Sequence, residues 1–105
     1  MGDTMSKKSE EFNLDVPVAK AASACKQAIE GLGWKTGDVE SNRIVAKVGF
    51  GAIRNPAQHE ILLSEDGKKS TGVQLNSKIL QVGPIAKSKL RKQADELREA
   101  IRDAV

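Results

Sequence analysis

The chain has 105 residues, of which 39% are hydrophobic and 30% charged, as is typical of one soluble globular domain. Two phenylalanines and one tryptophan are the only aromatic residues, which disfavours a function based on aromatic stacking. Seventeen basic and fourteen acidic residues give a net charge of +3, an excess too small to indicate a nucleic-acid partner by itself.

Cysteine usage and the start of the chain narrow the class of protein further. Cys25 is the only cysteine, so the sequence holds neither a disulfide framework nor the spacing of a zinc site, and we expect no metal and no cofactor. The first nine residues lack the apolar run of a signal peptide, and no segment approaches the roughly 18 apolar residues of a membrane span. We therefore expect a cytoplasmic protein in which residues 1–9 form a disordered tail and residues 10–105 a single domain.

The first two elements are a strand over residues 11–16 and an amphipathic helix over residues 17–32. In the strand, apolar and polar residues alternate, as in a strand with one solvated face. In the helix, apolar side chains recur every three or four residues and form one stripe. The residues of this stripe are Val18, Ala22, Cys25, Ile29 and Leu32. Gly31 and Gly33 predict the end of the helix.

Four short strands follow, over residues 34–39, 43–50, 59–64 and 71–78. Asp66-Gly67, between the last two, predicts a tight hairpin turn, because this dipeptide accepts the positive φ angles of such turns. The short connections make the four strands an antiparallel meander. Val45 and Leu62 interrupt the otherwise polar outer face of this sheet, which makes that face a candidate homodimer contact.

The chain ends in a second amphipathic helix over residues 85–104. Because each strand has one apolar face, both helices are expected to pack on the same side of the sheet. The sequence therefore predicts an α+β two-layer sandwich of the order β-α-β-β-β-β-α, with a curved antiparallel sheet and both helices on one face.

This order of elements resembles a known type of domain. FNLDVPVAKAASACKQAIEGLGW, followed by RIVAKVGF and TGVQLNSK, is similar to small bacterial domains of the TATA-binding-protein-like or helix-grip type. The resemblance covers residues 10–105 and concerns element order and general pattern, without a catalytic motif. It implies the two-layer fold and a binding module, in which the sheet and the long helix enclose an apolar ligand or the concave sheet meets a partner.

Two irregular segments beside the strands are candidates for a binding edge, because they place apolar residues in loops next to a cation. The residues concerned are Phe50, Ile53, Arg54, Ile79, Leu80 and Val82. In the alternative interpretation, the same side chains are buried and close the ends of the core. This is the interpretation that we favour. The main functional hypothesis is a non-catalytic module that binds a small apolar ligand or a protein at the sheet–helix cleft or at this loop rim.

The alternative hypothesis is weak nucleic-acid binding through the basic start of the second helix. The cationic residues there are Lys87, Lys89, Arg91 and Lys92, which could contact phosphates. A solvated helix face is the commoner role of such a cluster, and no exposed aromatic residue accompanies it. Nucleic acid is therefore the less favoured partner.

Enzymatic activity is not expected. Cys25 and His59 are the one conceivable nucleophilic pair of the sequence. Cys25 belongs to the apolar stripe of the first helix, where a thiol usually behaves as a small buried hydrophobe. His59 begins a strand on its apolar side, where a hydrogen-bonded structural imidazole is the commoner outcome.

Overall fold

Five strands and two helices follow one another in the predicted order in the computed structural model, which describes residues 6–40, 42–48, 57–67, 69–79 and 84–105. The elements are β1 (Ser6–Leu14), α1 (Val18–Gly31), β2 (Lys35–Val39), β3 (Arg43–Val48), β4 (Ala57–Glu65), β5 (Thr71–Ile79) and α2 (Pro84–Ala104). All neighbouring strands are antiparallel, and the sheet has the order β1-β5-β4-β3-β2. The predicted α+β sandwich and its meander of four strands are confirmed.

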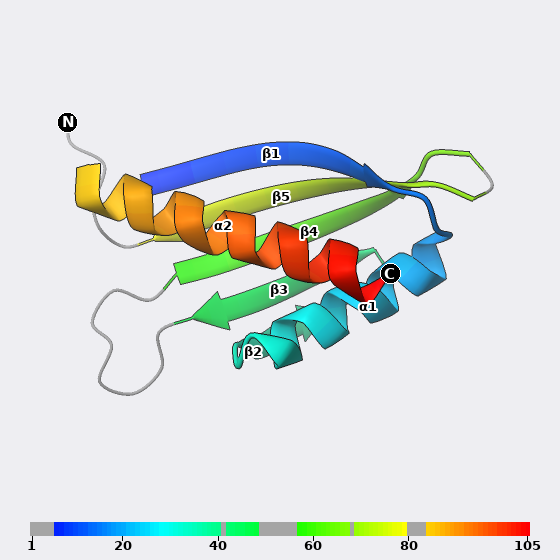
Figure 1. Ribbon diagram of the computed structural model, residues 1–105, viewed down its shortest axis with the longest axis horizontal. Coiled ribbons are helices and arrows are strands. Elements are labelled where there is room, and N and C mark those ends of the chain that lie inside the picture. Colours follow the sequence, from blue (N-terminus) through cyan, green and yellow to red (C-terminus); the bar gives the residue numbers. More distant parts are fainter. Residues whose placement is uncertain (1–5, 41, 49–56, 68, 80–83) are drawn as a thin grey trace.

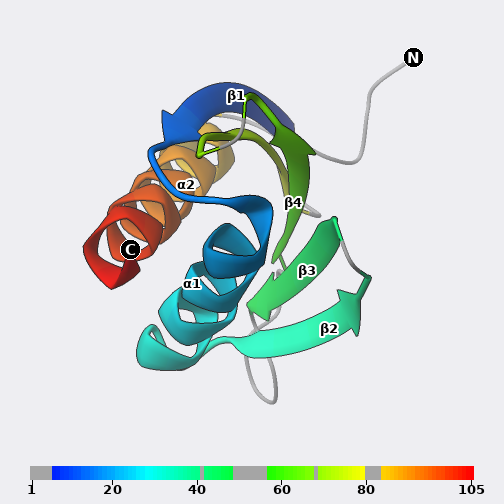
Figure 2. The ribbon, with the colours of Figure 1, turned by 90° about the vertical axis from the view of Figure 1, so that its right-hand side faces the viewer.

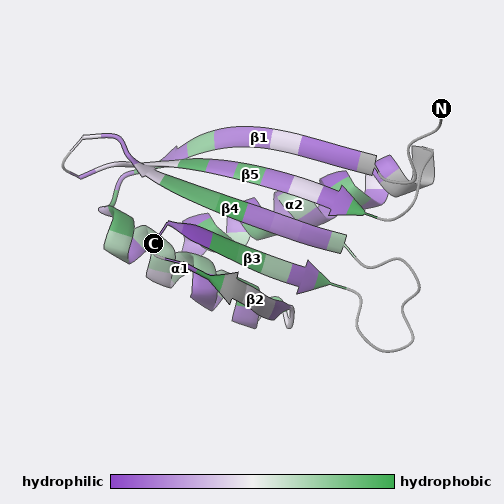
Figure 3. Ribbon diagram, turned by 180° about the vertical axis from the view of Figure 1, so that it is seen from behind, coloured by the Kyte–Doolittle hydropathy of each residue, from purple (hydrophilic) through white to green (hydrophobic). Residues whose placement is uncertain are grey.

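Both helices lie on one face of the sheet (Figure 1). The sheet curls around them, so that α2 crosses β1 and β5 while α1 lies under β3 and β4 (Figure 2). We call the face against the helices the inner face and the opposite face the outer face. The outer face carries no helix of the described chain (Figure 3), and its side chains therefore meet solvent unless their neighbours cover them.

The ends of α1 follow from local backbone chemistry. Pro17 precedes the first helical residue with extended angles of φ −63° and ψ 159°, in keeping with the fixed φ of proline. At the other end, Gly33 adopts φ +75°, which glycine tolerates without a Cβ penalty. This turn lets Gly33 N–H donate to Glu30 O and Trp34 N–H donate to Ile29 O, both at 3.0 Å. Two helix-terminal carbonyls are thereby satisfied, as in a Schellman motif.

β1 is longer than its alternating apolar pattern predicts. Residues 6–9 were expected to belong to a disordered tail, but they extend β1 and pair with β5 from Ser6 opposite Ile79 to Ser9 opposite Asn76. The tail prediction is wrong for these residues, because the backbone groups along the edge of β5 form a ladder with any extended segment, whatever its hydropathy. Residues 1–5 lie outside the described residues.

The hairpin between β4 and β5 keeps the predicted glycine but is longer than a two-residue turn. Gly67 adopts φ +89°, as the Asp-Gly signal requires. Asp66 N–H donates to Ser70 O at 3.0 Å, so the loop closes across residues 66–70. Both flanking strands extend a residue or more beyond their predicted ends, because the ladder between them continues through residues with weaker alternation.

The inner face holds two apolar clusters separated by a polar row. The large cluster joins both helices to the middle of the sheet, whereas the small one consists of Ala57, Ile79 and Leu90. Ala57 faces Ile79 across the ladder between β4 and β5, and the next inner pair along these strands is His59 with Ser77. The strand register therefore places two polar side chains between the two halves of the core.

Candidate functional site

His59 is fully buried and hydrogen-bonded on both ring nitrogens. Nδ1 lies 2.6 Å from Ser77 Oγ, and Nε2 lies 3.0 Å from Gln93 Oε1 on α2. Because a neutral ring has one donor and one acceptor, Nε2–H donates to Gln93 and Nδ1 accepts from the Ser77 hydroxyl. The Trp34 ring stacks on His59 with centroids 5.1 Å apart. Burial lowers the pKa of His59, only partly opposed by the Gln93 hydrogen bond, so the imidazole is a neutral structural group.

Cys25 and His59 do not form a nucleophilic pair. Both ring nitrogens of His59 are engaged by Ser77 and Gln93, which leaves neither to accept a thiol proton. Burial raises the pKa of Cys25 to about 12, so the thiol stays protonated at neutral pH and cannot act as a thiolate nucleophile. Cys25 packs in the large apolar cluster, as its place in the helix stripe indicates.

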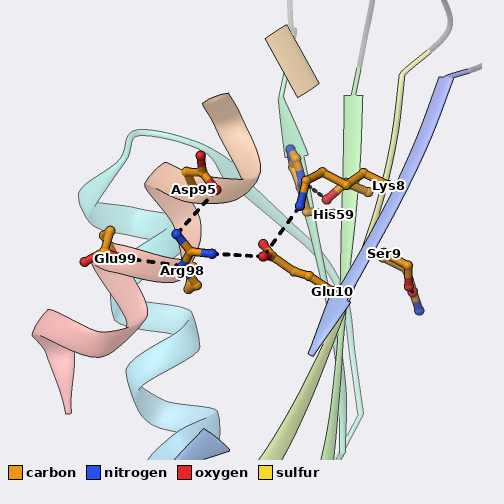
Figure 4. Close-up of polar contacts among 9 residues, drawn as sticks. Lys8, Ser9, Glu10, His59, Asp95, Arg98 and Glu99 are labelled. Carbon is orange, nitrogen blue, oxygen red and sulfur yellow. Dashed lines mark hydrogen bonds and ion pairs between the residues drawn. The ribbon is translucent and has the colours of Figure 1, made fainter. Parts of the chain in front are cut away.

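A charged cluster extends the polar row toward the edge strand. Glu10 reaches from β1 toward α2, where Arg98 Nη1 donates to its Oε2 at 3.0 Å (Figure 4). Lys8 Nζ lies 3.5 Å from the same oxygen, and Asp95 and Glu99 flank the guanidinium. Among the described residues, Glu10 Oε1 is buried without a hydrogen-bond partner. These ions tie β1 to α2 at the rim of the core.

Buried side chains line the sheet–helix cleft in the part of the chain that the structure describes. Of the predicted loop-rim residues, only Ile79 falls in the described part of the chain. Its side chain is 1% exposed and packs in the small apolar cluster, which fits the plug interpretation at this position. The others, Phe50, Ile53, Arg54, Leu80 and Val82, lie outside the described residues, so their role stays a prediction.

The basic residues predicted on the second helix are exposed. Lys87, Lys89, Arg91 and Lys92 all point into solvent from the first half of α2. Arg91 and Lys92 border a shallow surface hollow together with four carboxylates. Those carboxylates are Asp95, Glu96, Glu99 and Asp103. The mixture of signs is typical of a solvated helix face.

The outer face of the sheet carries a depression that the sequence analysis did not predict. We call this depression of about 450 Å³ the sheet groove. It is lined by Lys7, Lys8, Ser9, Arg43, Val45, Gln58, Glu60, Asn76, Ser77 and Lys78. Apart from Lys8 and Ser77, the strand register places these residues on the outer face. Side chains from β1, β3, β4 and β5 therefore build this groove.

A chain of polar contacts fixes one wall of the sheet groove. Arg43 Nε donates to Glu60 Oε2 at 2.7 Å, and Asn76 Nδ2 donates to Glu60 Oε1 at 3.2 Å. The Ser9 hydroxyl donates to Asn76 Oδ1. Hydrogen bonds from Arg43 and then from Asn76 hold the pKa of Glu60 below its usual range, with the positive charges of Arg43 and Lys78 adding to the effect. Each carboxylate oxygen thus accepts one hydrogen bond, and both bonds favour the ionised form.

The floor of the sheet groove is apolar. Val45 lies opposite Glu60 on the outer face, yet only 5% of Val45 is exposed. This burial changes the basis of the predicted homodimer contact, because Val45 is not an exposed apolar patch and Leu62 is half-buried beside it. The two residues were correctly placed on the outer face.

Comparisons with known proteins identify the fold. No protein-family model and no curated protein matches the sequence. Ara h 8.0201 superposes with a TM-score of 0.71 at 11% identity, covering 94% of this chain and 96% of that one. CalU16 from Micromonospora echinospora gives 0.63 at 13% identity, covering 91% and 71%, and an uncharacterised protein from Rhizobium leguminosarum gives 0.58 at 10%, covering 95% and 93%. At such low identity these similarities show the fold alone.

The shared fold is consistent with the helix-grip arrangement, in which a curved antiparallel sheet holds a long C-terminal helix. The narrower relation to TATA-binding-protein-like domains stays a prediction. Neither helix of the described chain is long and apolar enough to cross a lipid bilayer.

Proposed function

We propose that the chain is a non-catalytic binding module that takes a small ligand in the sheet groove. The observation that carries this proposal is the combination of an apolar floor at Val45 with a cationic rim formed by Lys7 and Lys78. Such a site fits a ligand with a flat apolar body and one anionic group. Its volume of about 450 Å³ lies within the range of small-molecule pockets.

The polar wall supports binding rather than catalysis. Glu60 is the carboxylate of the sheet groove, and its two oxygens accept hydrogen bonds from Arg43 and Asn76. A general base needs a pKa near the working pH, whereas these bonds lower the pKa of Glu60. The same bonds hold the wall in place before a ligand arrives, which reduces the ordering cost of binding.

A second candidate binding site is the sheet–helix cleft, where the helix-grip resemblance implies an apolar ligand or a protein contact. The observation in its favour is the small cluster of Ala57, Ile79 and Leu90, which stands apart from the large core beyond the His59 row. Ala57 and Ile79 also border residues 49–56 and 80–83 in the sequence. A ligand at this end would contact the inner face of the sheet. The two candidate sites therefore predict that different residues contact the ligand.

An NMR titration with 8-anilino-1-naphthalenesulfonate tests the proposal, because this probe joins an apolar aromatic body to a sulfonate. We expect saturable shifts of amide signals at Val45, Glu60 and Asn76. Lys78→Gln should weaken binding about threefold, the effect of losing one exposed charge contact. Lys69→Gln, at the exposed far end of the sheet, is the matched control and should leave the affinity unchanged.

The set of residues whose amide signals shift decides between the two candidate binding sites. Saturable shifts at Ile79 and Leu90 with none at Val45 would move the ligand to the sheet–helix cleft. Shifts that do not saturate, or equal affinities for the Lys78 and Lys69 variants, would contradict a site in the sheet groove.

A further inference from the structure

The strand register aligns one long polar side chain from each of the five strands in a row across the outer face. Lys7 of β1 lies opposite Lys78 of β5, which lies opposite Gln58 of β4. Gln58 lies opposite Lys47 of β3, and Lys47 lies opposite Lys35 of β2. Since direct partners in an antiparallel ladder project to the same side, all five share the outer face. We call them the lysine row.

The lysine row places like charges against each other. Lys7 and Lys78 are direct cross-strand partners, as are Lys47 and Lys35, and such pairs of equal charge destabilise a sheet. Within the part of the chain that the structure describes, Lys7 and Lys47 form no salt bridge, and the charge of Lys78 acts on Glu60 from across the ladder. Glu60 therefore offsets part of the repulsion at Lys78, whereas no salt bridge among the described residues offsets it at Lys7. An anion bound across the row would offset it.

The shape of the lysine row favours a linear polyanion. With neighbouring strands about 4.8 Å apart, the row spans roughly 19 Å in single file. The next outer row consists of Ser9, Asn76, Glu60 and Val45, so the positive charge does not spread into a plane as a membrane surface would require. The exposed large hydrophobics of the described chain, Val39 and Val105, lie at the ends of β2 and α2 away from the row, where they cannot anchor that face in lipid.

Exposed lysines of α2 add positive charge near the end of the sheet that carries the lysine row. α2 begins at the end where β5 finishes (Figure 1), so its exposed Lys87 and Lys89 add to the potential around the lysine row. A concentration of positive charge of this kind steers a negatively charged partner toward that end.

We infer that the lysine row docks the phosphate backbone of a single-stranded nucleic acid. The nucleic-acid strand runs across the five β-strands, and the ammonium groups of Lys7, Lys47 and Lys78 are available to its phosphates. The described outer face offers no aromatic side chain for base stacking, so binding depends on backbone charge, tolerates any sequence and weakens steeply with salt. The inference does not depend on a ligand in the sheet groove, although Lys7 and Lys78 belong to both surfaces.

Fluorescence anisotropy with a labelled 20-nucleotide oligothymidylate tests the inference at 50 and 200 mM salt. In the Lys7→Gln/Lys47→Gln/Lys78→Gln variant, we expect the Kd at low salt to rise at least about tenfold. The slope of log K against log salt should fall in magnitude by about 2, since each lost phosphate contact on a single strand contributes about 0.7. A variant with the same net charge, Lys20→Gln/Lys26→Gln/Lys69→Gln, removes three exposed lysines elsewhere and should bind within twofold of the wild type.

Thermal unfolding checks that the row variant folds. Its melting temperature should equal or exceed that of the wild type, because like-charge pairs are removed.

Three results would overturn the inference: equal losses in the row and control variants, a loss confined to a Lys87→Gln/Lys89→Gln/Lys92→Gln variant, or row-dependent binding to phosphatidylserine vesicles that exceeds binding to the oligonucleotide. Lys47→Gln separates this inference from the proposed function, because Lys47 does not line the sheet groove. It should weaken binding of the oligonucleotide and leave that of the naphthalenesulfonate probe unchanged.

Discussion

Replacing His59 with glutamine should remove a specific part of the pH dependence of folding. The wild-type imidazole is fully buried between Ser77 and Gln93 and stacked on Trp34. Desolvation penalises its protonated form, so its pKa is lower in the folded protein than in the unfolded chain. Protonation therefore favours unfolding.

The sign and size of the effect follow from proton linkage. Below the unfolded pKa of about 6.5 the unfolded chain binds one proton that the native protein does not. The stabilisation due to neutral His59 is fully present above this pH. It is lost as the pH falls from about 6.5 toward the lower pKa of the folded state. Within that window the free energy of unfolding should decrease by up to about 1.4 kcal/mol per pH unit.

Urea denaturation at pH 7.5, 6.5, 5.5 and 5.0 measures this slope for the wild type and for His59→Gln. The variant loses a stacked ring and is expected to be less stable at every pH, so the informative quantity is the difference between the two slopes. Carboxylates contribute equally to both proteins and cancel in that difference. Parallel curves between pH 6.5 and 5.0 would refute a buried neutral imidazole.

Three further substitutions and one thiol reaction test the packing. Ile29→Ala and Leu97→Ala each remove a fully buried side chain and should lower the free energy of unfolding by about 2–5 kcal/mol in urea titrations; a loss below about 0.5 kcal/mol would contradict the assigned helix faces. Cys25, with its pKa raised to about 12, should react with a disulfide reagent only after unfolding, and fast labelling of the native protein would restore it as a candidate nucleophile. Gly33→Ala forces a Cβ into φ +75° and should cost about 1–2 kcal/mol by thermal melts, whereas an unchanged melting temperature would rule out strain at this turn.

The fold was predictable because hydrophobic periodicity is local. The stripe that contains Cys25 and Ile29 identifies the buried face of α1 from the sequence alone, and both residues are fully buried. The same holds for Ile61 and Leu75, whose alternation with polar neighbours assigns the inner faces of β4 and β5. In each case the spacing of residues a few positions apart decides which side chains meet the core.

Features that depend on pairing between distant segments were not predictable in this way. Residues 6–9 carry no apolar pattern, and their place in β1 comes from the backbone edge of β5, some 70 positions away. The partners of His59 likewise come from β5 and from Gln93 on α2. The sheet groove and the lysine row combine side chains from strands whose register no local spacing reveals. The isolated apolar residue Val45 on a polar face was the one local signal for the sheet groove.

The pairing register of β4 with β5 determines which side chains lie on each face of the sheet. Because side chains alternate along a strand, a shift of β5 by one residue against β4 would carry Ser77 to the outer face and Lys78 into the core. Burying the Lys78 ammonium group without a partner costs several kcal/mol, and moving Ser77 outward forfeits its hydrogen bond to His59. The hydrogen-bonded row inside the core therefore also fixes the cations outside it. Substitutions such as Ser77→Val, which remove the inner polar partner, should loosen the alignment of the lysine row before they disturb the apolar clusters.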